Sequence, residues 1–279
     1  MDPKMNNIIL VPTDFSEVCE NALNQAVEAA KYLKYKIALL HVIDKNTRAQ
    51  LKKENEEPQV INERLDKLAV RVNTDHGVEV ESITREGDIF TTISEVARDI
   101  GANLMYLGTH GKVGMQKLTG SFAIKVVTSS PVPVVVVQKR PFAEGYKKMV
   151  LPITSDAGPW EKTKWAAFMA KNFKSSVHIY RLSDPELDEA VNILTSHFDK
   201  EDISYQVSKS GGGNFSRQVL DYATSVNADL IMIMTNPDKS FTKFLLGSYD
   251  EEMIFNAAQI PVMCINPRKY NWEKIFRKV

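Results

Sequence analysis

The sequence predicts an α/β fold with two domains in tandem, each with an open five-stranded parallel sheet and helices on both faces. Short apolar runs alternate with helical patterns along the chain, as expected when crossover helices cover parallel strands. The second half repeats the order of elements of the first, and a duplication is the simplest explanation. With 279 residues, of which 43% are hydrophobic and 25% charged, the chain is long enough for two folded domains.

The first half contains five apolar runs of strand length. These predicted strands are residues 8–11, 36–43, 78–83, 104–107 and 132–137. Asp14 and Ser16 are both good helix-capping residues, and Asp14 with Glu17 resembles a capping box, so the first helix is predicted to begin here. Pro58 is predicted to interrupt a helical segment over residues 47–73, because proline breaks a helix interior. Gly87 and Asp88 open a further helix.

The repeat sets a register between the halves. Residues 148–152 repeat the first strand, and residues 228–234 repeat residues 102–107. The pairs Gly120-Ser121 and Gly247-Ser248, 127 positions apart, each precede a helix and then an apolar strand. We expect domains over residues 1–143 and 146–279. The same register places Thr235, Asp238 and Thr154 at the positions of Gly108, Gly111 and Asp14.

Charge and cysteine content exclude several classes of protein. Lys+Arg and Asp+Glu are both 35, so net attraction to nucleic acid or to an anionic membrane surface is not expected. Cys19 and Cys264 lie far apart without a CxxC motif, which argues against a disulfide framework or a zinc site. The five histidines lack ligand spacing, so no metal site is expected. The polar start has no leader or membrane span, and a cytoplasmic location is expected.

The glycine-rich stretch after the fourth strand is the most informative motif. Gly108 and Gly111 let backbone N–H groups approach a ligand, and a helix starting at Ser121 directs its positive end to the same place. Carboxyl ends of parallel strands share one edge, so residues 12–14 and 108–111 are expected to converge there. His110 either contacts phosphate or is simply exposed.

At these residues the chain resembles the universal stress protein family. IILVPTDFSE, LLHVID, GTHGKVG with the later GS, and SSPVPVVVV carry the resemblance, strongly in the first half and mainly by pattern in the second. The resemblance implies a fold of the adenine nucleotide alpha hydrolase type and a site for ATP or another adenine nucleotide, with or without Mg²⁺. The expected site residues are Pro12, Thr13, Asp14, Val42, Gly108, His110, Gly111, Gly120, Ser121 and Phe122.

Two departures from the family pattern limit the expected site. Eight residues separate Gly111 from Gly120 where nucleotide-binding members have nine. In the second half, the carboxylate of Asp238 would repel phosphate, and Thr154 stands where the first half has the carboxylate of Asp14. The nucleotide site of the second half therefore looks degraded. An alternative is that the glycines only turn the chain. The loop over residues 210–214 is interpreted as a flexible turn with a helix cap.

The leading interpretation is a stress-response regulatory protein that binds an adenine nucleotide in its first domain. A slow ATPase and a ligand-free interaction module are the alternatives, since no general base or arginine clamp stands out. The apolar strands 132–137 and 261–265 are each predicted to end their own sheet. We expect them to join the halves into an internal pseudo-dimer, and family resemblance leaves a homodimer of the whole chain open.

Overall fold

The computed structural model describes residues 6–110, 120–141, 145–154, 159–235 and 248–266. In the first half, strands alternate with helices, as the hydrophobic periodicity predicts. The elements are β1 Ile8–Pro12, α1 Glu17–Leu33, β2 Lys36–Ile43, α2 Lys45–Glu54, α3 Gln59–His76, β3 Val80–Glu86, α4 Ile89–Asp99, β4 Leu104–Gly108, α5 Gly120–Ser129 and β5 Val134–Val137.

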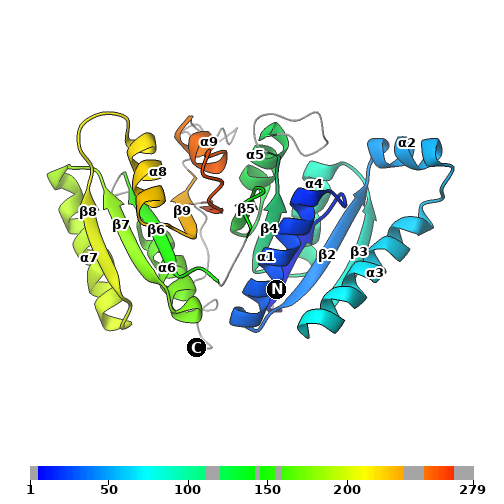
Figure 1. The fold of residues 1–279 in the computed structure, drawn as a ribbon, viewed down its shortest axis with the longest axis horizontal. Coiled ribbons are helices and arrows are strands. Elements are labelled where there is room, and N and C mark those ends of the chain that lie inside the picture. Colours follow the sequence, from blue (N-terminus) through cyan, green and yellow to red (C-terminus); the bar gives the residue numbers. More distant parts are fainter. Residues whose placement is uncertain (1–5, 111–119, 142–144, 155–158, 236–247, 267–279) are drawn as a thin grey trace.

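The second half follows the same plan with a short 3₁₀ turn in place of α2. Its elements are β6 Lys148–Ile153, α6 Pro159–Phe173, β7 Ser176–Arg181, η1 Pro185–Leu187, α7 Asp188–Lys200, β8 Tyr205–Lys209, α8 Phe215–Ser225, β9 Leu230–Met234, α9 Ser248–Ile254 and β10 Val262–Ile265. Figure 1 shows the halves side by side, with α2 projecting at the outer end of the first half.

The strands form a single ten-stranded sheet in the order β3-β2-β1-β4-β5-β10-β9-β6-β7-β8. Strands within each half are parallel, because helices return the chain over the sheet between them. The two five-stranded sheets predicted from the sequence are thus joined into one continuous sheet. Hydrophobic side chains on one face pack against α1, α3, α6 and α7, and those on the other face against α4, α5, α8 and α9. Each core runs across both halves.

The halves meet at an antiparallel ladder in which Val136 of β5 lies opposite Val262 of β10. This ladder confirms the predicted association through the fifth strands. Two buried amides reinforce it reciprocally. Gln138 Nε2 donates to Ile254 O and Asn256 O at the end of α9 (3.3 and 3.2 Å), and Asn266 Nδ2 donates to Val127 O and Ser130 O at the end of α5 (2.7 and 3.1 Å). The helix ends of each half are thus capped by the other.

Some local predictions were wrong. The N-cap of α1 is Ser16 and its side chain makes no capping bond, so the capping box of Asp14 and Glu17 does not form. β3 begins and ends later than expected, at Val80 and Glu86, because the alternation of apolar residues at 78–83 does not mark where pairing with β2 stops. Among the described residues no helix is long and apolar enough to cross a bilayer.

Candidate functional site

A small pocket opens at the carboxyl ends of β1 and β2, in the first half. Its lining combines the end of β1, the end of β2, the start of α2, and the first turns of α4 and α5. The lining residues are Pro12, Thr13, Asp14, Leu40, His41, Val42, Asp44, Thr47, Ile89, Ile93 and Phe122.

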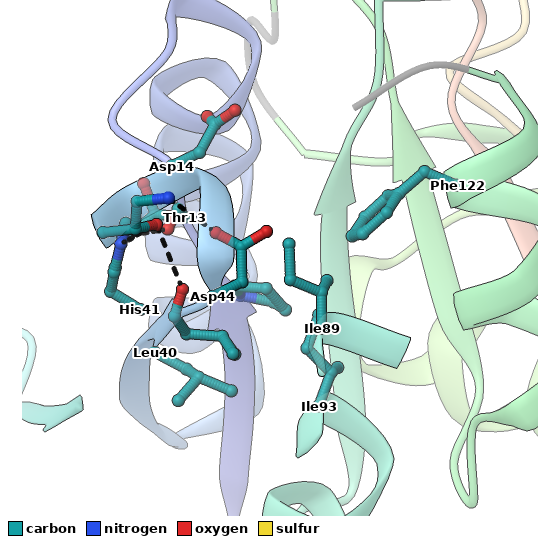
Figure 2. A pocket seen from close by; sticks show the side chains of 11 residues that line it. Thr13, Asp14, Leu40, His41, Asp44, Ile89, Ile93 and Phe122 are labelled. Atoms are coloured by element: carbon teal, nitrogen blue, oxygen red, sulfur yellow. Dashed lines mark hydrogen bonds between the residues drawn. The ribbon is translucent and has the colours of Figure 1, made fainter. Parts of the chain in front are cut away.

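The turn after β1 is fixed by its own side chains. Thr13 Oγ1 accepts from Phe15 N and Asp14 Oδ1 accepts from Ser16 N, both at 3.0 Å, and Phe15 adopts a positive φ of 65°. Figure 2 shows the Asp14 carboxylate directed away from Leu40 and Ile93. Burial, reinforced by the Asp14 carboxylate, raises the pKa of the Cys19 thiol, so that this cysteine stays protonated and unreactive.

Val42 presents an open main-chain edge to the cavity. The ladder between β1 and β2 ends with Pro12 opposite Leu40, and Thr13 N donates to Leu40 O at 2.8 Å. Residues two apart on a parallel strand face the same neighbour, so the N–H and C=O of Val42 lie on the side where β1 has ended. The edge therefore presents the Val42 N–H as a donor and its carbonyl as an acceptor beside an apolar wall; the carbonyl also accepts from Asp44 N at 3.1 Å and lies 3.5 Å from Thr47 Oγ1.

Polar groups behind this edge form a buried network. His41, 5% exposed, has Nδ1 2.8 Å from Thr13 O and Nε2 3.3 Å from Thr47 Oγ1, and its ring stacks on Phe15 with centroids 4.9 Å apart. Asp44 is the N-cap of α2 and accepts from Thr47 N at 2.7 Å. The network positions the Val42 edge and the β1 turn relative to each other.

The opposite wall is apolar. In Figure 2 the Phe122 ring reaches from α5 toward Ile89, and Ile93 lies one helical turn further along α4. Phe122 is 5% exposed and contacts Phe90 with ring centroids 5.3 Å apart. Lys125 Nζ lies 4.6 Å from the centroid of Phe90, which places a cation on the first turns of α5.

The structure brings five of the expected site residues into the cavity lining: Pro12, Thr13, Asp14, Val42 and Phe122. Gly120 begins α5 with Ser121 next to it, and Gly111 lies outside the described residues. His110 follows β4, and its Nε2 is buried with no hydrogen-bond partner among the described residues; the same is true of Ser16 Oγ at the start of α1. These two polar atoms lie near the ends of β1 and β4.

Gly108 has a clear structural role. A Cβ atom at Gly108 would lie 2.5 Å from Val18 O and 2.8 Å from Cys19 N, so only glycine allows α1 to approach β4 this closely. The close packing of α1 on β4 accounts for Gly108 without a ligand. It therefore favours the alternative in which the glycines have a purely structural role.

Six lining residues were not expected: Leu40, His41, Asp44, Thr47, Ile89 and Ile93. A signal for three of them was present. The polar residues His41 and Asp44 interrupt an apolar strand end in LLHVID, and Thr47 follows within one helical turn. Ile89 and Ile93 look like ordinary core residues of a helix, and only the tertiary fold shows that they face a cavity.

The register between the halves was wrong by one residue at the fourth strand. Thr109 N donates to Val137 O at 2.8 Å, and Thr235 N donates to Ile265 O at 3.0 Å, so Thr235 matches Thr109. Met234 therefore stands at the position of Gly108. The register derived from the Gly-Ser pairs fails here because the second half has one more residue between its strand and those pairs. Asp238 lies outside the described residues, and Thr154 is exposed after β6.

Aromatic side chains occupy the matching space in the second half. Tyr180 lies opposite Pro152 as Leu40 lies opposite Pro12, and Phe215 follows its N-cap as Ile89 does. Tyr180 stacks on Phe215, and Phe215 on Tyr249, with centroids 5.8 and 6.3 Å apart. Among the described residues, no group of three or more His, Cys, Asp or Glu side chains could hold a metal ion.

Comparisons with known proteins agree with this architecture. The model of the universal stress protein family matches residues 5–138. Universal stress protein MJ0577 of Methanocaldococcus jannaschii is 34% identical over 156 residues, which cover 47% of this chain and 94% of that protein. Universal stress protein Sll1654 of Synechocystis is 29% identical over 137 residues, covering 48% of this chain and 86% of that protein.

A solved structure extends the similarity to the whole fold. A universal stress protein from Archaeoglobus fulgidus aligns with a TM-score of 0.75 and 21% identity, and the alignment covers 94% of this chain and 98% of that one. At this identity the match concerns the fold, and it spans both halves. The chain belongs to the universal stress protein family and carries two halves of that type in tandem.

Proposed function

We propose that the cavity of the first half binds an adenine nucleotide and that the protein acts as a regulatory binding protein in the stress response. In this proposal the base enters the apolar cavity, the ribose lies at Asp14, and the phosphates extend over the start of α5. The open main-chain edge of Val42 is the observation that carries the proposal, because it is unpaired by β1 and lies beside an apolar wall.

The edge matches the chemistry of adenine. Adenine presents an amino donor at N6 beside a ring acceptor at N1, and Val42 offers a carbonyl acceptor beside an N–H donor. Leu40, Ile93 and Phe122 supply apolar contacts for the two ring faces. A buried apolar cavity with a few fixed polar groups is the usual form of a small-molecule site.

Polar groups at the other end of the cavity support the placement of the phosphates. The start of α5 at Gly120 directs unpaired N–H groups and the positive end of the helix dipole toward the carboxyl edge of the sheet. His110 Nε2 and Ser16 Oγ are buried there without a hydrogen-bond partner among the described residues. Lys125 adds positive charge one turn into the same helix.

The cavity lining favours binding over catalysis. Among the described residues, the ionisable side chains of the lining are Asp14, His41 and Asp44. Asp44 is committed to the N-cap of α2, and His41 lies behind the edge in contact with Thr13 and Thr47. Slow ATP hydrolysis and a ligand-free role remain the alternatives, and a cytoplasmic location belongs to the same proposal.

Mass analysis of small molecules released from freshly purified, denatured protein tests the proposal. We expect ATP, ADP or AMP, together with a rise in melting temperature on adding ATP that GTP does not reproduce. No released nucleotide and no thermal shift with any adenine nucleotide would leave the ligand-free role as the better account.

A further inference from the structure

His41, Thr47 and the Val42 carbonyl are linked by a chain of hydrogen-bond contacts. The Nδ1 atom of His41 lies 2.8 Å from Thr13 O, which can only accept, so Nδ1 carries a proton in either charge state of the ring. The other nitrogen, Nε2, lies 3.3 Å from Thr47 Oγ1. In the neutral ring Nε2 is an acceptor, and it becomes a donor when the ring is protonated.

The Thr47 hydroxyl has one proton and two acceptors within reach. Nε2 of His41 lies at 3.3 Å and Val42 O at 3.5 Å. When His41 is neutral, the hydroxyl donates to Nε2. When His41 is protonated, Nε2–H donates to Thr47 Oγ1, and the hydroxyl proton is left for Val42 O. The two arrangements exclude each other because the hydroxyl is a single donor.

The position of the Thr47 hydroxyl proton decides whether the Val42 carbonyl has a lone pair free for a ligand. A carbonyl oxygen has two lone pairs, and Val42 O already accepts from Asp44 N at 3.1 Å. With neutral His41, one lone pair is left for a ligand. With protonated His41, the Thr47 hydroxyl takes it. No N–H of β1 competes for this position, because the ladder to β2 ends at Leu40.

The charges around the ring come from three neighbouring segments. Asp14 in the β1 turn and Asp44 at the start of α2 line the same cavity as the ring. On α2, Lys45 is exposed and Arg48 is ion-paired with Glu86. On α3, Arg64 is ion-paired with Glu54 and Glu56. The ring itself is 5% exposed and covered by Phe15.

We propose that His41 and Thr47 form a proton-controlled switch on the Val42 carbonyl, so that protonation of His41 weakens binding of the adenine base. The inference rests on the proposed function of the cavity and adds its regulation. Histidine is the side chain whose ordinary pKa lies closest to neutral pH, so acidification is the signal that such a switch would read.

Calorimetric titration of the full chain with adenosine between pH 5.5 and 8.5 tests the switch, since adenosine carries no phosphate that ionises in this range. We expect the dissociation constant to rise about tenfold toward low pH, as the loss of one buried acceptor predicts. Thr47→Val, which keeps the shape and lacks the hydroxyl, should remove this pH dependence. Thr92→Val, at a buried threonine outside the cavity lining, should keep it.

NMR titration of the His41 ring gives a second readout. Adenosine should move its titration midpoint to lower pH in the wild type and leave it unchanged in Thr47→Val. An unchanged pH dependence in Thr47→Val, or a flat dissociation constant in the wild type, would overturn the switch. Absence of adenosine binding at every pH would refute the proposed function itself, and the switch with it.

Discussion

The two halves share one architecture and differ in what fills the crevice at the carboxyl ends of their first two strands. In the first half, Leu40, Ile89 and Phe122 line a small open pocket. In the second half, Tyr180, Phe215 and Tyr249 stand at the matching positions and stack on one another. Larger side chains thus stand at the three equivalent positions and fill, among the described residues, space that is open in the first half.

A buried lysine adds to the difference. Lys162 of α6 is 8% exposed, and its Nζ donates to Pro152 O at 2.5 Å. Ala22 stands at the equivalent position of α1, 140 residues earlier, as Pro12 does for Pro152. In the second half this lysine thus occupies the carbonyl at the end of β6, and the alanine at the equivalent position of the first half has no group that could do so. Under the proposed function, this difference favours binding in the first half.

Exchanging the filling residues should give the largest effect. Leu40→Tyr with Ile89→Phe reproduces the second half in the first, and we expect the affinity for ADP to fall about 1000-fold or more, since the base is excluded. Calorimetry with ADP measures this. The matched control, Tyr180→Leu with Phe215→Ile, should leave the affinity within about twofold. Unchanged ADP binding in a folded first-half variant would mean that the ligand lies elsewhere.

The buried lysine gives the second half a pH signature. Burial lowers the pKa of Lys162 from 10.5 to about 8, partly opposed by the Asp250 carboxylate. Between these values the unfolded chain binds a proton that the folded chain has lost, so stability rises with pH. Relative to Lys162→Met, the wild type should gain about 2–3 kcal/mol of unfolding free energy from pH 8 to 10.5. Parallel pH profiles of the two proteins in urea unfolding would contradict this.

Gly108 and its counterpart Met234 allow a further test. Gly108→Ala places a Cβ atom 2.5 Å from Val18 O, a backbone atom that cannot move without shifting α1. We expect a loss of about 1–3 kcal/mol in unfolding free energy. Gly212→Ala, where no atom lies within 4 Å of the added Cβ, is the matched control and should change stability by less than about 0.5 kcal/mol. Equal effects of the two substitutions would show that the close approach of α1 is not tight.

The smallest effect concerns the contact between the halves. Asn266→Ala removes the amide that caps Val127 O and Ser130 O and that accepts from Thr235 Oγ1 at 2.6 Å. Thermal or urea unfolding should show a loss of about 1–2 kcal/mol. Gln138→Ala, its counterpart in the other half, should cost a similar amount. Two separate unfolding transitions in the wild type would show that the halves do not act as one cooperative unit.

Much of the fold could be predicted because strand and helix periodicities are local. The structure has β4, β5 and α4 close to where they were predicted from the apolar runs at 104–107 and 132–137 and from the glycine before Asp88. The association of the fifth strands was also predictable, since both are short and apolar. Merging of the sheets depends on the ladder of Val136 with Val262, which no local pattern encodes.

The candidate site was only partly predictable. Pro12 and Asp14 follow from their place at the end of a strand, and Val42 follows from the family resemblance; the structure brings all three to one cavity. Degradation of the site in the second half was inferred from Asp238 and Thr154, whereas among the described residues the space is filled by Tyr180, Phe215 and Tyr249. These aromatic residues look like ordinary core positions, and their meaning depends on which residues of the first half they replace. The domain limits at 143 and 146 stay a prediction.

Native mass spectrometry of the full chain with ATP tests the central claim most directly, because it counts bound nucleotides per chain. One ATP per chain is expected for the wild type and none for Leu40→Tyr with Ile89→Phe, since the second half is closed by its own side chains. Two bound nucleotides in the wild type, or one that persists in the filled variant, would contradict the account.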